Sequence, residues 1–184
     1  MHQIRIHGRG GQGVVTAAEL IAIAAFQEGR FAQAFPFFGV ERTGAPIQAF
    51  ARIDDKEIRL REQIYNPDVL IIQDASLIGQ VNLTAGTDAK TVIIVNTAKT
   101  REEIAQDLKL EKNNIHTVDA TKIALEIFGK NLVNTTILGA VAKATGLISL
   151  PALKKAAKKK FQEKGEGIIE KNIKAIESTY YKVL

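Results

Sequence analysis

A glycine-rich loop between a strand and a helix is the feature that most limits how this chain can fold. Residues 3–7 alternate between apolar and polar side chains, which predicts a short strand with its two isoleucines on one face. The loop at 8–13 has four glycines in six positions. Residues 14–26 are nearly all apolar and predict a helix that is buried over most of its surface. Gly29 follows, where a helix end favours a residue with positive φ.

The composition of this loop predicts contact with an anion. Glycines let the backbone turn sharply and let a ligand approach it closely. The N–H groups and the dipole at the start of the helix then favour a phosphate, and Arg9 can add a charge-assisted hydrogen bond. A tight turn that binds nothing is the alternative, but a loop directly between strand and helix favours phosphate or pyrophosphate. The predicted binding residues of the loop are Gly8, Arg9, Gly10, Gly11, Gln12 and Gly13.

The segments that follow predict a mixed sheet. Residues 30–35 form a second candidate strand. Residues 46–53 and 57–61 both alternate, with the polar turn 54–56 between them, which is typical of an antiparallel hairpin. Such a hairpin does not occur in a simple parallel doubly wound sheet, so we expect parallel and antiparallel strands together.

Two continuous apolar runs, 69–72 and 91–95, predict central strands that are buried on both faces. Asp74 follows the first run, at the carboxyl end where ligands gather in open α/β sheets. It can equally cap the next turn, which is the interpretation we favour. A short strand at 115–118 contains His116, which has no second candidate ligand nearby and is predicted to lie at the surface or at an edge rather than on a metal.

The remainder of the chain is predicted to be largely helical. Capping residues and glycines delimit these helices, with Thr100 at the first start, Gly129 and Gly146 at later ends, and Pro151 near the start of a lysine-rich helix. A last helix is expected over 168–180. No linker or repeat interrupts the sequence, so residues 1–184 are expected to form a single domain.

Composition excludes several kinds of chemistry. The sequence has no cysteine, so this chain offers no disulfide, no cysteine-ligated iron–sulfur cluster and no thiol catalyst. The formal net charge is +5, and five lysines lie within 154–160. We favour a solvated helix face over an acidic partner or nucleic acid, because no nucleic-acid-binding motif accompanies the lysines. No signal peptide and no run of membrane-spanning length is apparent, so a cytoplasmic protein without a membrane anchor is expected.

The glycines also match the dinucleotide-binding pattern G-x-G-x-x-G through Gly8, Gly10 and Gly13. That fold requires an acidic residue for the ribose at the end of its second strand. Here the second candidate strand ends at Pro36, and the next acidic residue is Glu41. A stand-alone NAD(P)-binding oxidoreductase and a non-enzymatic nucleotide-binding module are therefore kept as alternatives.

Longer stretches of the sequence resemble one known family. Residues 4–18 closely resemble the opening of the gamma subunit of 2-oxoacid:ferredoxin oxidoreductases, and residues 35–46 resemble that subunit's second motif. Residues 66–74 and 134–140 are similar as well, in the same order and with similar spacing. The form of the second motif is more similar to the pyruvate and branched-chain 2-oxoacid enzymes than to the 2-oxoglutarate enzymes.

The resemblance implies a fold and a function. The fold is a three-layer α/β/α sandwich with a mixed sheet. The enzyme oxidatively decarboxylates a 2-oxoacid to its acyl-coenzyme A and reduces ferredoxin. Thiamine diphosphate and the iron–sulfur clusters are held by other subunits, so the expected partners are alpha, beta and delta-type subunits, with ferredoxin reached through the complex. This chain is expected to be inactive alone and to contribute to coenzyme A binding and to assembly.

The resemblance also bears on the loop before the third strand. Glu41 and Arg42 match the family's second motif, which implies a position near the coenzyme A site or at a subunit boundary. Both possibilities stay open from the residues alone. Thr43 departs from the family pattern, where a second arginine is common, and a missing guanidinium weakens a phosphate or carboxylate contact.

Overall fold

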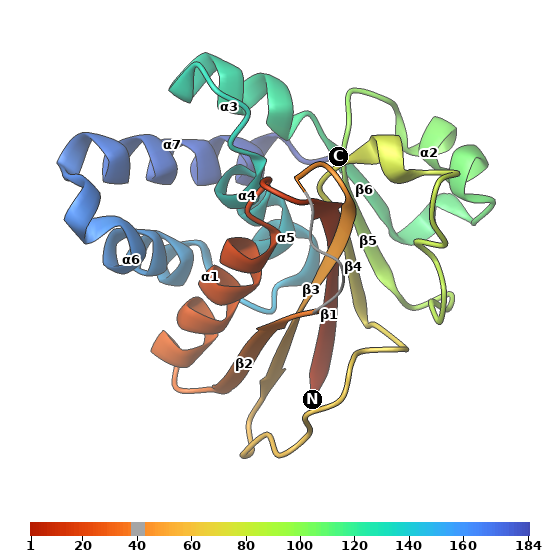
Figure 1. The fold of residues 1–184 in the computed structure, drawn as a ribbon, viewed down its shortest axis with the longest axis horizontal. Coiled ribbons are helices and arrows are strands. Elements are labelled where there is room, and N and C mark those ends of the chain that lie inside the picture. Colours follow the sequence, from red (N-terminus) through yellow and green to blue (C-terminus); the bar gives the residue numbers. More distant parts are fainter. Residues whose placement is uncertain (38–42) are drawn as a thin grey trace.

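The computed structural model describes residues 1–37 and 43–184. Within these residues the chain forms seven α-helices and six strands, and Figure 1 shows their arrangement. The strands are β1 (His2–Arg9), β2 (Phe31–Pro36), β3 (Pro46–Asp54), β4 (Val69–Ile72), β5 (Val92–Asn96) and β6 (Ile115–Val118). The helices are α1 (Val14–Gln27), α2 (Arg101–Leu108), α3 (Ala120–Phe128), α4 (Val133–Thr136), α5 (Leu138–Thr145), α6 (Leu150–Phe161) and α7 (Glu166–Lys182).

The predicted mixed sheet is confirmed. Its strand order is β2-β3-β1-β4-β5-β6. Strands β1, β4, β5 and β6 run parallel, whereas β3 is antiparallel to both β1 and β2. The central parallel strands β4 and β5 are nearly continuous apolar runs because both faces of the sheet are covered there.

The predicted hairpin between 46–53 and 57–61 is wrong. Residues 57–61 form no strand, and most of them are exposed. The antiparallel neighbours of β3 are β2 and β1, which pair with it along both of its edges. A strand has only two edges for backbone pairing, so no edge of β3 is left for residues 57–61.

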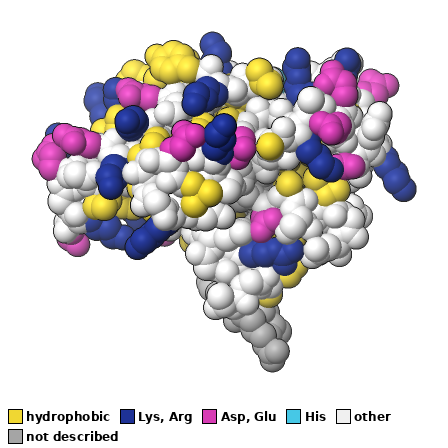
Figure 2. Space-filling view, turned by 90° about the horizontal axis from the view of Figure 1, so that it is seen from above, with side chains coloured by type: hydrophobic (Ala, Val, Ile, Leu, Met, Phe, Trp, Pro, Cys, Tyr) yellow, Lys and Arg dark blue, Asp and Glu magenta, His cyan; other side chains and the backbone are white. Residues whose placement is uncertain are grey.

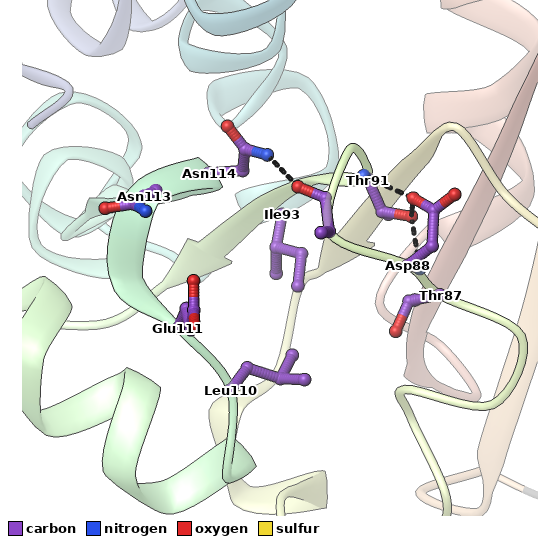
Figure 3. Close-up of a pocket in the computed structure, with 9 residues that line it drawn as sticks. Thr87, Asp88, Thr91, Ile93, Leu110, Glu111, Asn113 and Asn114 are labelled. Carbon is purple, nitrogen blue, oxygen red and sulfur yellow. Dashed lines mark hydrogen bonds between the residues drawn. The ribbon is translucent and has the colours of Figure 1, made fainter.

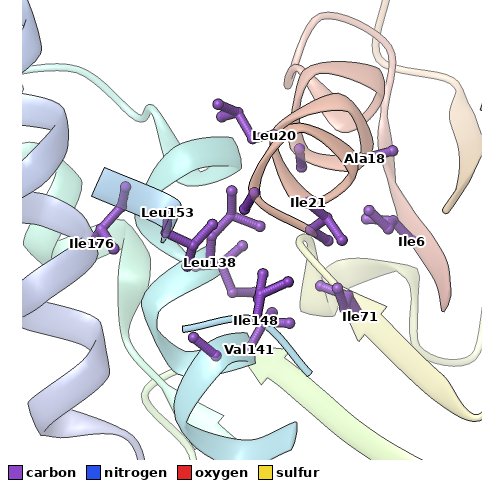
Figure 4. Close-up of a cluster of buried hydrophobic side chains, with 14 of the residues drawn as sticks. Ile6, Ala18, Leu20, Ile21, Ile71, Leu138, Val141, Ile148, Leu153 and Ile176 are labelled. Carbon is purple, nitrogen blue, oxygen red and sulfur yellow. The ribbon is translucent and has the colours of Figure 1, made fainter. Parts of the chain in front are cut away.

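The sheet lies between two unequal layers (Figure 1). Helices α1 and α3–α7 cover one face and enclose the larger core, part of which is drawn in Figure 4. In that core Ile6 and Ile71 of the sheet pack with Ile21 of α1 and with Leu138 and Val141 of α5. Helix α2 and the segment after β4 cover the other face over a smaller cluster around Leu70, Ile72 and Ile104. The three-layer prediction is therefore confirmed.

The uncovered part of the second face is closed by two chain segments that two buried arginines hold in place. Arg5 of β1 donates to four backbone carbonyl oxygens, those of Ile64, Tyr65, Leu83 and Ala85. Arg52 of β3 donates to the carbonyl oxygens of Glu62 and Gln63. Burial lowers the pKa of both guanidinium groups, and for Arg52 the charge of Glu62 partly offsets this effect.

Several predicted helix boundaries are confirmed by their caps. Thr100 and Glu103 form a complete capping box at α2. Asp119 caps α3, and Gly129 ends it with a positive φ of 66°. Ser149 caps α6, with Pro151 in its first turn. The helical segment that was predicted to end at Gly146 occurs as α4 and α5, which are joined through Ile137.

Candidate functional site

The glycine-rich loop lies at the carboxyl end of the sheet, at the point where the chain changes direction. From β1 the chain passes through α1 to β2 on one side, whereas from β4 it passes to β5 on the other side. The loops after β1 and β4 are therefore neighbours that leave in opposite directions. Ligands in open α/β sheets bind at such a position. It lies toward the upper end of the sheet in Figure 1.

The loop directs the start of α1 into open space. Gly11 and Gly13 have φ values of 90° and 71°, which glycine adopts readily and other residues rarely adopt. Within the described residues, no side chain caps α1, and its first turn has no acidic residue. The free N–H groups of that turn keep their affinity for an anion. A cavity of about 430 Å³ adjoins them, lined by Gly10, Gly11, Gly13, Val14, Val15, Thr43 and Ile47.

Two polar side chains of the loop are bound by protein groups. Arg9 lies 3.2 Å from a carboxylate oxygen of Asp74 and also donates to Ser76 Oγ, Gln80 Oε1 and the Gly44 carbonyl. Gln12 accepts from the Arg9 N–H at 2.8 Å and donates to Asp74 at 2.7 Å. These contacts hold the shape of the loop, and the glycines Gly10, Gly11 and Gly13 line the adjoining cavity.

Asp74 is the centre of this network. It caps the turn that follows β4, as predicted, by accepting from the Ser76 N–H at 3.0 Å. Burial opposes its ionisation. Hydrogen bonds from Ser76 and Gln12 and the charge of Arg9 outweigh burial and hold the pKa of Asp74 below its usual value. The carboxylate therefore stays ionised and joins the loop after β1 to the loop after β4.

The second motif lies against the first. The Gly10 N–H donates to the Ala45 carbonyl at 2.9 Å, and the Gly44 N–H donates to the Gly10 carbonyl at 3.0 Å. The structure therefore brings together two stretches that are about thirty residues apart in the sequence. Glu41 and Arg42, which precede this contact, lie outside the described residues.

Helix α4 supplies a residue that sequence reasoning did not assign to the site. A Cβ atom placed on Gly13 would collide with the side chain of Asn134. Asn134 is half-buried beside the loop, and no hydrogen bond of its amide is found within the described residues. The sequence pointed to it through the similar stretch 134–140.

A second, polar cavity of about 210 Å³ adjoins the loop at the ends of β4 and β5. Sequence reasoning missed it because its walls come from five separate segments. Asn96 is fixed there by two hydrogen bonds with Thr121 and donates to the Gln73 carbonyl. The lining residues are Gln12, Gln73, Asp74, Ala75, Ser76, Asn96, Thr121 and Asn131.

The remaining candidates have structural explanations. A cavity at the opposite end of β5 (Figure 3) has polar groups that bond one another, as in the Asp88–Thr91 turn and the bond from Asn114 to the Ala89 carbonyl. The ring of His116 contacts the Leu184 carbonyl. Over the described residues there is no group of three metal-ligating His, Cys, Asp or Glu side chains, and no helix is long and apolar enough to cross a bilayer.

The lysine-rich helix α6 packs its apolar face into the core, and its lysines face outward. Lys154 pairs with Glu177 and Lys160 pairs with Glu19, each at 2.6 Å. Positive and negative side chains are interspersed over the face seen in Figure 2. These observations favour the solvated-face interpretation.

Comparison with known proteins decides the family. A family model described as pyruvate ferredoxin/flavodoxin oxidoreductase matches residues 3–181. The chain belongs to this family. It is 53% identical to the common gamma subunit of the pyruvate/ketoisovalerate oxidoreductases of Thermococcus kodakarensis, over 100% of this chain and 98% of the relative. It is 50% identical to the pyruvate synthase subunit PorC of Methanocaldococcus jannaschii, with the same coverage.

Solved structures agree with this family assignment. A pyruvate oxidoreductase subunit PORC from Thermotoga maritima has a TM-score of 0.87 and 36% identity, over 100% of this chain and 97% of the other. A 2-oxoglutarate:ferredoxin oxidoreductase from Magnetococcus marinus, solved with coenzyme A bound, has a TM-score of 0.79 and 21% identity. The match spans 98% of this chain and 30% of that longer one, and it shows the fold alone. The chain is a gamma subunit of a 2-oxoacid:ferredoxin oxidoreductase, and thus part of an enzyme complex.

Proposed function

We propose that this gamma subunit serves an enzyme that converts pyruvate or a branched-chain 2-oxoacid to its acyl-coenzyme A, and that its glycine-rich loop binds phosphate groups of coenzyme A. Coenzyme A accepts the acyl group that oxidative decarboxylation releases. The relatives named for pyruvate and ketoisovalerate support this substrate class. Alpha, beta and delta-type subunits would supply thiamine diphosphate and the iron–sulfur clusters, and ferredoxin would accept the electrons.

The observation that carries the proposal is the uncapped start of α1. Its N–H groups adjoin a cavity of about 430 Å³, and the neighbouring glycines leave the backbone open to a ligand. A pyrophosphate requires such a backbone surface more than it requires a particular side chain. Gly10, Gly11 and Gly13 would contact the phosphates, whereas Gly8, Arg9 and Gln12 would act by holding the loop. Glu41 and Arg42 remain proposed contacts to the cofactor or to a neighbouring subunit.

The test is steady-state kinetics of the reconstituted complex with Gly13→Ala in this subunit. The new methyl group would displace Asn134 and strain a backbone with φ of 71°. We expect the KM for coenzyme A to rise about tenfold or more while the KM for the 2-oxoacid stays unchanged.

Gly29→Ala is the matched control. Gly29 lies at the other end of α1 with a similar φ of 79°, and a Cβ there meets no atom within 4 Å. It carries the same backbone strain without touching the loop, so it should leave both KM values unchanged. Equal KM values for coenzyme A in both variants and the parent would contradict the proposal.

A further inference from the structure

Strand β2 is the last strand on its side of the sheet (Figure 1), and its outer edge pairs with no strand in the described part of the chain. Its inner edge pairs with β3. The Phe37 N–H donates to the Gln48 carbonyl, which fixes the alternation of hydrogen bonds along this antiparallel pair. The backbone groups of Ala32 and Ala34 therefore point away from β3, and no hydrogen bond of their N–H groups is found among the described residues.

The opposite edge of the sheet is covered by the chain itself. Leu184 exchanges two backbone hydrogen bonds with Thr117 of β6. Native proteins cover, charge or interrupt their edge strands, because unpaired backbone groups recruit other chains. On β2 no side chain is charged, and Pro36, which has no N–H, interrupts the outward row of groups at its last position only. The outer edge of β2 can therefore accept a further strand.

A cavity of about 380 Å³ lies beside this edge. Its lining residues are Gln33, Phe35, Pro36, Phe37, Arg61 and Gln63. The rings of Phe35 and Phe37 lie on the same face of the sheet and pack against Phe50, with 5.2 Å and 6.5 Å between ring centroids. Phe37 is nevertheless 36% exposed. A strand added to β2 would direct every second side chain to this face, next to the aromatic cavity.

Arg61 is the charged residue among those that line the cavity. Its side chain is exposed, and no ion pair or hydrogen bond of its guanidinium is found in the part of the chain that the structure describes. Arg59, two residues earlier, is by contrast paired with Glu57 at 3.0 Å. No carboxylate is among the described lining residues, and the exposed amide of Gln63 adds further N–H donors. The charge of the cavity therefore suits an acidic side chain.

We propose that the outer edge of β2 binds an extended segment of a neighbouring subunit, which adds a strand to the sheet and places an acidic side chain beside Arg61. The relatives of this chain are named as subunits, so neighbouring subunits are expected around it. In such binding, backbone hydrogen bonds supply affinity and cavities for alternate side chains supply specificity. This cavity shares no lining residue with the cavity at the glycine-rich loop, so the inference does not depend on coenzyme A binding.

Hydrogen exchange resolved to single amides tests the added strand, in the full chain alone and in the reconstituted complex. We expect the N–H groups of Ala32 and Ala34 to exchange at least about tenfold more slowly in the complex. Those of Gln33 and Phe35 face β3 and are the internal control, with a smaller change expected. Equal exchange at Ala32 and Ala34 in both samples would overturn the inference. Slower exchange in the chain alone as its concentration rises would also overturn it, because a second copy would then be the occupant.

Charge reversal tests the acidic side chain. Arg61→Glu should raise the dissociation constant of this subunit from the complex about tenfold or more, because two carboxylates would then face each other. Arg59→Glu is the matched control, since it reverses the same charge on an exposed residue that does not line the cavity, and it should leave the dissociation constant unchanged. Equal melting temperatures of the free chains confirm that both variants fold. No effect of Arg61→Glu, or equal weakening in both variants, would overturn the inference.

Discussion

His7 lies in an environment very different from that of a free side chain. It is 3% exposed on β1, and burial together with the charge of Arg5 lowers its pKa to about 3. The unfolded chain binds a proton at His7 below about pH 6.5, whereas the folded chain stays neutral there. The folded state is therefore favoured at neutral pH and loses stability as the pH falls from about 6.5 toward 3.

We predict that the free energy of unfolding decreases by up to about 1.4 kcal/mol per pH unit through this window because of His7. Chemical denaturation of the chain at several pH values measures this slope. His7→Phe should reduce it, whereas replacing the exposed His2 by Gln should not. Parallel pH profiles for His7→Phe and the parent would contradict the assignment.

Asp74 gives a second prediction, because its pKa is likewise lowered in the folded chain. Its depressed pKa means that its contribution to stability is complete at neutral pH, above the ordinary value of about 3.9, and is lost as the pH falls through the folded pKa. Asp74→Asn should therefore cost about 1 kcal/mol at pH 7 and progressively less in acid.

The Asp74 variant should also loosen the glycine-rich loop, because Arg9 and Gln12 lose their shared acceptor. Amide hydrogen exchange measured at pH 7 should be faster over residues 9–13 and unchanged in β5. Equal protection of the loop in Asp74→Asn and the parent would show that the other contacts of Arg9 suffice.

At the scale of elements, α5 and α7 approach closely at Gly139. A Cβ on Gly139 would collide with the carbonyl oxygen of Ile176, and Thr179 Oγ1 donates to the Thr136 carbonyl at 2.5 Å nearby. Gly139→Ala should force the helices apart and destabilise the chain by roughly 1–3 kcal/mol. Thermal or chemical unfolding measures this change.

Gly167→Ala is the control for that variant. Gly167 lies in the first turn of α7, and a Cβ there meets no atom within 4 Å. Alanine is the better helix former, so the control should be neutral or slightly stabilising. A similar loss of stability in both variants would show that close packing at Gly139 is not the cause.

The elements also show what the sequence could predict. The glycine-rich strand, loop and helix, the buried parallel strands and most helix ends depend on local patterns, and they were predicted correctly. The prediction of a hairpin between 46–53 and 57–61 was wrong because β3 pairs with β1 and β2. The alternation of side chains at 57–61 does not identify the strand with which a segment pairs. The burial of Arg5 and Arg52 was not foreseen, since the segments that cover them are distant in the sequence or have no regular structure.

The site was predictable only in part for the same reason. The glycine-rich loop is contiguous, so its backbone could be recognised directly. The link from Gln12 to Asp74 spans 62 residues, and the cavity beside it joins five segments. Arg9 was predicted as a charged ligand, but its ion pair with Asp74 and its hydrogen bonds to three other protein groups could be seen only in the folded chain.

At the scale of the molecule, this chain is one part of an enzyme. Without cysteine it cannot ligate an iron–sulfur cluster through thiolates. We predict that the purified chain alone produces no acyl-coenzyme A from pyruvate or a branched-chain 2-oxoacid, and that activity appears when alpha, beta and delta-type subunits are added. Anaerobic assay of each combination checks this, and full activity of the chain alone would contradict the subunit assignment.

The central claim is that the loop at residues 8–13 contacts coenzyme A. The most direct measurement is photo-crosslinking of the intact complex with a coenzyme A analogue that carries a photoreactive group near its pyrophosphate, followed by peptide mapping. The account predicts labelling within residues 8–16 of this subunit, suppressed by excess coenzyme A. Labelling confined to the other subunits, with the same suppression, would contradict it.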